Sequence, residues 1–135
     1  MAVKRVDIVE EFATEYARVR DWLIAALQVQ IADGDERKLL SGLGTGKYQL
    51  WTSQRAACVT ELCRVDNNDV CLLYLVAGET NNALEDILGE GQKAVEDFAK
   101  ANGCKGFYGI GRPEWKHVLK PQGFEVVSVN FYKEF

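Results

Sequence analysis

Apolar residues recur every three or four positions along residues 8–27, which predicts an amphipathic helix with one buried face. That stripe comprises Ile8, Phe12, Tyr16, Val19, Leu23 and Leu27. A second, shorter helix is predicted over residues 36–43, because Asp35 can cap its N-terminus and Gly42 and Gly44 can end it. The chain is therefore expected to open with two helices.

Three strand patterns follow. Residues 48–52 and 56–65 are separated by a polar turn, and a second turn cluster at 66–69 precedes the next run. Residues 70–77 are uniformly apolar, which is typical of a central strand covered on both faces. These three runs predict an antiparallel meander.

The second half alternates helices and strands. A helical stripe over residues 84–102 ends at Gly103, and Gly89 and Gly91 interrupt it at a cost of about 1 kcal/mol each relative to alanine. These two glycines mark a kink, a close contact or the true helix start. A strand over 106–109, a helix over 113–120 and a closing strand over 124–135 complete the order ααβββαβαβ. We predict one α/β (α+β) domain over residues 1–135, with a mixed, mostly antiparallel sheet flanked by helices.

Composition narrows the class of protein. The 135 residues are 47% hydrophobic, enough for one core, and no apolar run approaches the roughly 20 residues of a membrane span. Sixteen Lys and Arg against 20 Asp and Glu give a net charge of −4, which argues against nucleic-acid binding. Acids follow the N-terminal Met within a few residues, unlike a secretory leader, so a cytoplasmic protein is expected.

The cysteines do not predict a metal site. Cys58, Cys63, Cys71 and Cys104 form no C-x-x-C pair, and the single histidine, His117, lies far from three of them in sequence. Three of the four fall inside apolar strand-like runs. We expect reduced core cysteines and no metal.

Three local strings carry a family resemblance. The apolar strand at 70–77 leads to a helix ending A-K-A-N-G-C at 99–104, and G-F at 123–124 precedes the last strand. This arrangement resembles the GNAT acyltransferase superfamily. The string G-R-P-E-W-K-H-V-L at 111–119 and the first hairpin are similar to those of small GNAT-like proteins encoded by bacteriophages. The resemblance covers about residues 8–135.

The resemblance implies a site for acetyl-CoA in active members. The backbone of Val76 and Ala77 would hold the pantetheine arm, and Gly89 and Gly91 would lie near the pyrophosphate. The superfamily's pyrophosphate turn reads Q/R-x-x-G-x-G/A, whereas Asp86 occupies its first position here and further acids surround it. Close carboxylates would oppose a bound anion.

The catalytic positions of the superfamily are also altered. Leu119 stands where many members place the tyrosine that protonates the leaving thiolate, and leucine transfers no proton. The remaining catalytic candidates are Glu61, Tyr108 and His117. We expect Tyr108 in the core, and His117 on the exposed side of its helix.

These departures favour a non-catalytic, phage-encoded virion or assembly component that uses the fold as a protein-binding scaffold. Such a protein needs no cofactor, binds other phage or virion proteins, and resides in the host cytoplasm or is incorporated in the virion. Its interface is predicted at Trp115, Tyr132 and Phe135, unless these aromatic residues belong to the core. The alternatives are an acetyl-CoA-dependent N-acetyltransferase with an irregular pyrophosphate loop, and a small regulator of a host protein.

Overall fold

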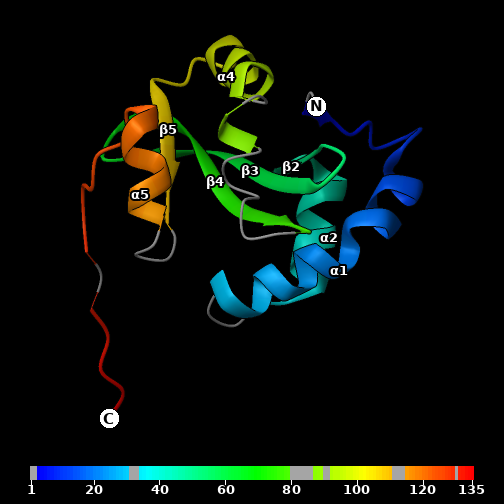
Figure 1. The fold of residues 1–135 in the computed structure, drawn as a ribbon, viewed down its shortest axis with the longest axis horizontal. Helices are drawn as coiled ribbons and strands as arrows, with labels where there is room; N and C mark the ends of the chain where they lie inside the picture. The colour runs from blue at the N-terminus through cyan, green and yellow to red at the C-terminus, as the bar shows by residue number, and fades with distance from the viewer. Residues whose placement is uncertain (1–2, 31–33, 80–86, 90–91, 111–114, 130) are drawn as a thin grey trace.

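The computed structural model describes residues 3–30, 34–79, 87–89, 92–110, 115–129 and 131–135 (Figure 1). Its elements, in chain order, are β1 (Lys4–Arg5), α1 (Phe12–Gln30), α2 (Glu36–Thr45), β2 (Tyr48–Thr52), β3 (Ala56–Val65), β4 (Asn68–Gly78), α4 (Gln92–Ala101), β5 (Gly106–Gly109), α5 (Trp115–Leu119) and the 3-10 turn η1 (Lys120–Gln122).

The predicted meander is confirmed and forms the centre of the sheet. The strand order is β1-β2-β3-β4-β5, with antiparallel pairs throughout except between β4 and β5, which are parallel. Asp66 and Asn67 both adopt positive φ between β3 and β4, the backbone that a two-residue hairpin turn requires. The short strand β1 was not predicted, because two residues carry no periodicity.

Helices cover both faces of the sheet, and the core is divided accordingly. We call the cluster under α1 and α2 the α1/α2 cluster; it includes Leu23, Leu39, Leu43, Leu50, Val59 and Leu75. The cluster on the other face, beneath α4 and α5, is the α4/α5 cluster; it includes Trp51, Cys58, Cys71, Leu73, Val95 and Trp115. The central strands are therefore buried on both sides, as their apolar sequence predicts.

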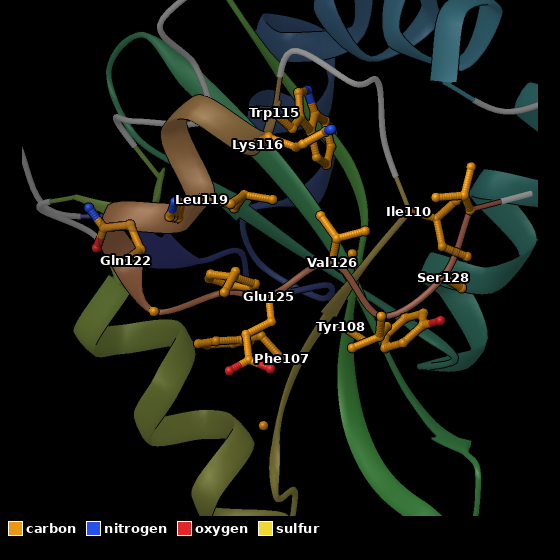
Figure 2. A pocket seen from close by; sticks show the side chains of 17 residues that line it. Phe107, Tyr108, Ile110, Trp115, Lys116, Leu119, Gln122, Glu125, Val126 and Ser128 are labelled. Carbon is orange, nitrogen blue, oxygen red and sulfur yellow. The ribbon is translucent and has the colours of Figure 1, made fainter.

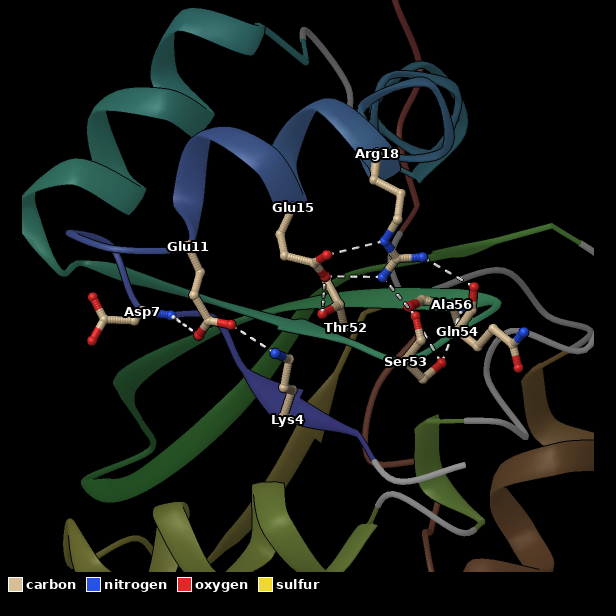
Figure 3. Close-up of polar contacts among 9 residues, drawn as sticks. All are labelled: Lys4, Asp7, Glu11, Glu15, Arg18, Thr52, Ser53, Gln54 and Ala56. Carbon is tan, nitrogen blue, oxygen red and sulfur yellow. Dashed lines mark hydrogen bonds and ion pairs between the residues drawn. The ribbon is translucent and has the colours of Figure 1, made fainter.

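Polar contacts connect α1 to the end of β2 and to the β2–β3 turn (Figure 3). Glu15 accepts a hydrogen bond from the Thr52 hydroxyl at 2.8 Å and pairs with Arg18 at 2.9 Å. The Arg18 guanidinium also donates to the backbone carbonyls of Ser53 and Gln54, at 2.9 and 3.0 Å. One arginine thus satisfies the carbonyls of the β2–β3 turn while holding α1 over it.

Several predicted helix boundaries need correction. The first helix begins at Phe12, so Ile8 precedes it and is exposed. Asp35 caps α2 as predicted, accepting from the Arg37 amide, but the helix continues through Gly42 and Gly44 to Thr45 and ends at Gly46, which has φ 84°. Within the predicted helix over 84–102, Ile87 and Leu88 are helical, Gly89 is a turn residue and α4 spans Gln92–Ala101. Residues 84–86 and 90–91 of that range lie outside the described residues.

The predicted closing strand over 124–135 is wrong for the described residues. After Gly123, which has φ 92°, residues 124–129 and 131–135 are extended but belong to no strand of the sheet (Figure 1). The alternating sequence predicts an extended backbone. It does not predict whether a neighbouring strand is close enough to form hydrogen bonds with that backbone.

The cysteines are unpaired in the structure. Cys58 and Cys71 are buried and Cys63 and Cys104 are half-buried. Burial raises the pKa of all four thiols, that of Cys71 to about 12, so they are poor nucleophiles. Among the described residues, no helix combines the length and apolarity needed to cross a membrane.

Candidate functional site

A bulge in β4 lies where the pairing of β4 with β5 ends. Thr60 of β3 pairs with Leu73 and its neighbour Val59 pairs with Leu75, so Tyr74 is an extra residue on β4. Because a bulge bends its strand and increases the local twist, β4 changes course here. Its pairing with β5 ends at the same place, with Leu73 opposite Gly109, while β4 runs on to Gly78. We call the place where β4 runs on past the end of β5 the β4–β5 notch.

The bulge also sorts side chains between the two faces. Leu73 and Val76 pack into the α4/α5 cluster, whereas Tyr74 and Leu75, adjacent in sequence, both face the α1/α2 cluster. Val76 and Ala77, predicted to hold a pantetheine arm, lie on β4 beyond the bulge with both side chains buried. Their backbones therefore border the notch, and the cofactor role remains a prediction.

A row of half-buried side chains crosses the sheet beside the notch. Glu61 of β3 pairs with Tyr48 of β2 and with Leu72 of β4, and Leu72 pairs with Tyr108 of β5. Directly paired residues share a face. The structure thus places two predicted catalytic candidates, Glu61 and Tyr108, in one row, with Leu72 between them.

Tyr74, which sequence reasoning missed, joins this row from the bulge. Its ring stacks on that of Tyr48 with centroids 4.7 Å apart. Burial, followed by the hydrogen bond with Tyr48 and then by nearby charge including that of Glu61, raises the pKa of Tyr74 to about 12. The tyrosine is therefore protonated at neutral pH. Its place in a uniformly apolar run gave no signal of an exposed polar group.

The N-terminus of α4 follows Gly89 along the chain, on the face of the sheet that carries the α4/α5 cluster. Ile87 and Leu88 are buried and helical, and Gly89 is an exposed turn residue. Residues 90–91, between Gly89 and α4, lie outside the described residues, so the question of a kink or a helix start stays open. Gly91 and the acids Glu85, Asp86 and Glu90 lie outside the described residues. The first turn of α4 holds Lys93 and no acid, and Lys93 pairs with Asp97 at 2.9 Å. A helix N-terminus and a lysine both favour an anion.

The remaining predicted residues do not meet at this site. His117 is on the exposed side of α5, as expected, and Leu119 is half-buried. Trp115 is only 7% exposed and belongs to the α4/α5 cluster, so it is a core residue and not an exposed anchor. Tyr132 and Phe135 are exposed, and their interface role stays a prediction. Within the described residues, no group of three or more His, Cys, Asp or Glu is placed to hold a metal ion.

A second feature lies on the outer side of β5. A groove of about 1170 Å³ separates β5 and α5 from residues 124–129 (Figure 2). Phe107, Tyr108, Trp115 and Leu119 line one side of this groove, which we call the β5 groove, and Val126 and Ser128 line the other. Tyr108 therefore contributes to the β5 groove, and it is half-buried rather than a core residue.

The meander, the parallel β4–β5 pair and the helices on both faces make a GNAT-like α+β fold, which solved acetyltransferases share. The structure superimposes with a TM-score of 0.68 on the aminoglycoside acetyltransferase meta-AAC0020 from an uncultured soil metagenomic sample, in complex with sisomicin; the two are 12% identical over 98% of this chain and 95% of that one.

Two further solved structures agree. Aminoglycoside N-acetyltransferase AAC(6')-Iy in complex with CoA gives a TM-score of 0.66 at 13% identity, covering 98% of this chain and 93% of that one. A Trypanosoma brucei acetyltransferase gives 0.53 at 8% identity, covering 98% of both chains. No protein-family model and no curated protein sequence matches the chain. Identities this low establish the fold alone.

Proposed function

We propose that this protein binds an acyl-CoA thioester at the β4–β5 notch and transfers the acyl group to an amine. The observation that carries the proposal is the bulge at Tyr74. It lies where the pairing of β4 with β5 ends, and the pairing register places Glu61, Tyr74 and Tyr108 on the same face of the sheet. The likeness to an acetyltransferase in complex with CoA supports it.

The binding roles follow from position. The backbone of Val76 and Ala77 borders the notch and would hold the pantetheine arm. The diphosphate would lie at the N-terminus of α4, where the first turn holds no acid and Lys93 adds a positive charge. A CoA molecule spanning the two would cross the edge of the sheet between β4 and α4.

The chemistry is a substitution at the thioester carbonyl. The amine nitrogen forms a bond to the carbonyl carbon, the carbon–sulfur bond breaks, and Glu61 accepts the proton that the amine loses. Tyr74, with a pKa of about 12, is a weaker acid than a thiol with a pKa of about 8.5, so it would hydrogen-bond to the substrate rather than protonate the leaving thiolate. The thiolate can take its proton from solvent, which fits a chain that has Leu119 at the usual donor position.

Calorimetric titration with acetyl-CoA tests the proposal, and α4 offers a matched pair of variants. Lys93 and Lys100 are both exposed and each pairs with an acid at 2.9 Å, but they lie at opposite ends of the helix. Lys93→Gln should weaken acetyl-CoA binding about tenfold or more, because it removes a charge-assisted contact of roughly 1.5–3 kcal/mol. Lys100→Gln should leave the affinity unchanged.

Absence of binding at millimolar acetyl-CoA would overturn the proposal. The non-catalytic scaffold expected from the altered pyrophosphate turn would then be the better hypothesis, and copurification with phage particles would test it. Equal affinity loss in both lysine variants would place the anion away from the N-terminus of α4.

A further inference from the structure

Among the described residues, α1 and α2 cover only part of the sheet face beneath them. Strand residues at one end of that face are buried in the α1/α2 cluster: Leu50, Ala57, Val59, Leu75 and Ala77. Toward the other end, the pairing register and the alternation of side chains place five half-buried residues: Glu61, Cys63, Leu72, Tyr74 and Tyr108. We call these five residues the open face.

The open face is aromatic and apolar around a single carboxylate. Tyr74 stacks on Tyr48 with the ring planes 16° apart. Leu72 pairs with both Glu61 and Tyr108, so an apolar side chain separates the carboxylate from a further ring. Tyr108 also lines the β5 groove, which adds space at this end of the open face (Figure 2). A carboxylate beside tyrosine rings suits an organic cation with an apolar body.

The charges around the open face limit how many positive charges such a ligand can carry. Glu61 is the only acid among the described strand residues on this side of the sheet. Lys47 precedes the residue that pairs with Glu61, and its Nζ lies 5.3 Å from the ring centroid of that residue, Tyr48. A second cationic group on the ligand would meet this lysine and no further strand carboxylate.

We propose that the acyl acceptor is an amine with one positive charge on a flat apolar body, bound on the open face. This inference rests on the acyl transfer proposed above and names its substrate class. The body would pack on Leu72 and against the rings of Tyr74 and Tyr108, and the nitrogen would lie beside the Glu61 carboxylate.

The transfer requires two protons to leave the acceptor nitrogen. The bound ammonium first loses one proton to solvent. The neutral nitrogen then bonds to the thioester carbonyl carbon, the carbon–sulfur bond breaks, and Glu61 takes the second proton. The thiolate takes a proton from solvent, so the products are an amide and free CoA thiol.

Release of free CoA thiol from acetyl-CoA, measured with three amines, tests the substrate class. The amine 2-phenylethylamine carries one charge and a ring, n-butylamine carries one charge and no ring, and spermidine carries several charges. The kcat/KM for 2-phenylethylamine should exceed that for either of the others by at least about tenfold. The reason is that n-butylamine lacks the apolar area of the ring, and the extra charges of spermidine have no carboxylate partner on the open face.

A matched pair of variants tests whether the open face sets this preference. Leu72 pairs with Glu61, whereas Leu40 is on α2, is 36% exposed and lies outside the open face. Leu72→Glu places a second carboxylate beside the first, so the preference for 2-phenylethylamine over spermidine should fall by at least about tenfold. Leu40→Glu adds the same charge elsewhere and should leave that preference unchanged. Circular dichroism and calorimetric titration with acetyl-CoA check that each variant folds and binds the donor.

Tyr108→Ala provides a second test that does not depend on the folding of Leu72→Glu. It removes a ring from the open face, so the kcat/KM for 2-phenylethylamine should fall more than the kcat/KM for n-butylamine. An unchanged preference in both folded variants would overturn the inference.

The unaltered protein separates failure of the inference from failure of the proposed function. A kcat/KM for spermidine or n-butylamine equal to or above that for 2-phenylethylamine would overturn the substrate class and leave acyl transfer intact. No thiol release with any of the three amines would overturn the acyl transfer, and the inference with it.

Discussion

At the scale of single residues, the proposed acyl transfer depends most on Glu61. It lies half-buried between Tyr48 and Leu72, on the row that reaches Tyr108, and its charge acts on the pKa of Tyr74. A carboxylate in such a row can accept a proton from an amine bound beside the notch. No other described acid of the sheet shares this row.

Glu61→Gln therefore separates catalysis from binding. It should lower kcat for acyl transfer by roughly 10²–10⁴-fold, the usual contribution of a general base. The dissociation constant for acetyl-CoA should stay unchanged, because Glu61 lies away from the N-terminus of α4. Release of free CoA thiol measures the rate and calorimetry the affinity. An unchanged kcat would remove Glu61 from the mechanism.

Glu36 carries a pH-dependent contact between the first two helices. Its carboxylate accepts a hydrogen bond from the Tyr16 hydroxyl at 2.6 Å and pairs with Arg20 at 2.7 Å. Hydrogen bonding to Arg20, and next to Tyr16, holds the pKa of Glu36 below its usual value. A lowered folded-state pKa adds stability above the unfolded value of about 4.3, and this stability is lost as the pH falls through the folded-state pKa.

Glu36→Gln should therefore be less stable than the unaltered protein at pH 7, and the difference should shrink as the pH falls below about 4. Urea denaturation at pH 7 and pH 3 measures both values. Glu79→Gln is the control, because the Glu79 carboxylate is exposed and its ion pair with Arg55 is 4.0 Å long. An equal Glu36→Gln difference at both pH values would contradict the assignment.

At the scale of elements, α2 shows why two glycines of one helix differ. A side chain at Gly42 would overlap the ring of Tyr48, which is itself stacked on Tyr74, whereas nothing lies within 4 Å of a Cβ at Gly44. Gly42 therefore permits the close packing of α2 on β2. Gly44 only weakens the helix.

Alanine substitutions should consequently have opposite signs. Gly42→Ala should lower the free energy of unfolding by about 1–3 kcal/mol through overpacking. Gly44→Ala should raise it by about 0.5–1 kcal/mol, because alanine loses less conformational freedom in a helix. Urea denaturation of both variants measures the difference, and a stabilised Gly42→Ala would refute the close packing.

The sequence predicted those elements whose pattern is local. The bounds of β2, β3 and β5 match the prediction, since turn residues flank each run. The end of α2 was misplaced because a glycine that allows close packing looks the same in sequence as one that ends a helix. The bulge was missed because a bulge is visible in sequence only as a break in the alternation of polar and apolar residues. Residues 70–77 are uniformly apolar and have no such alternation.

At the scale of the whole molecule, the site depended on long-range pairing that no local pattern contains. Glu61 and Tyr108 were singled out separately, and only the register across β3, β4 and β5 places them in one row. The C-terminal segment shows the converse. The sequence of residues 124–135 predicts a strand. Whether that strand finds a partner depends on the direction in which the chain leaves η1, and the described residues provide none.

The division of the core by the sheet has a consequence for variation. The two clusters share no residue, and the sheet keeps them apart. Free-energy effects of substitutions add when the sites are more than about 7–10 Å apart and share no partners. Helix residues such as Leu23 of α1 and Val95 of α4 have the whole sheet between them, whereas strand neighbours such as Leu50 and Trp51 do not. The helices of the α1/α2 face can thus accumulate changes that remodel the surface around Glu61, while the α4/α5 face keeps its own packing. For the acyltransferase proposed above, a new acceptor preference could evolve on this face without matching changes in the helices on the opposite side of the sheet.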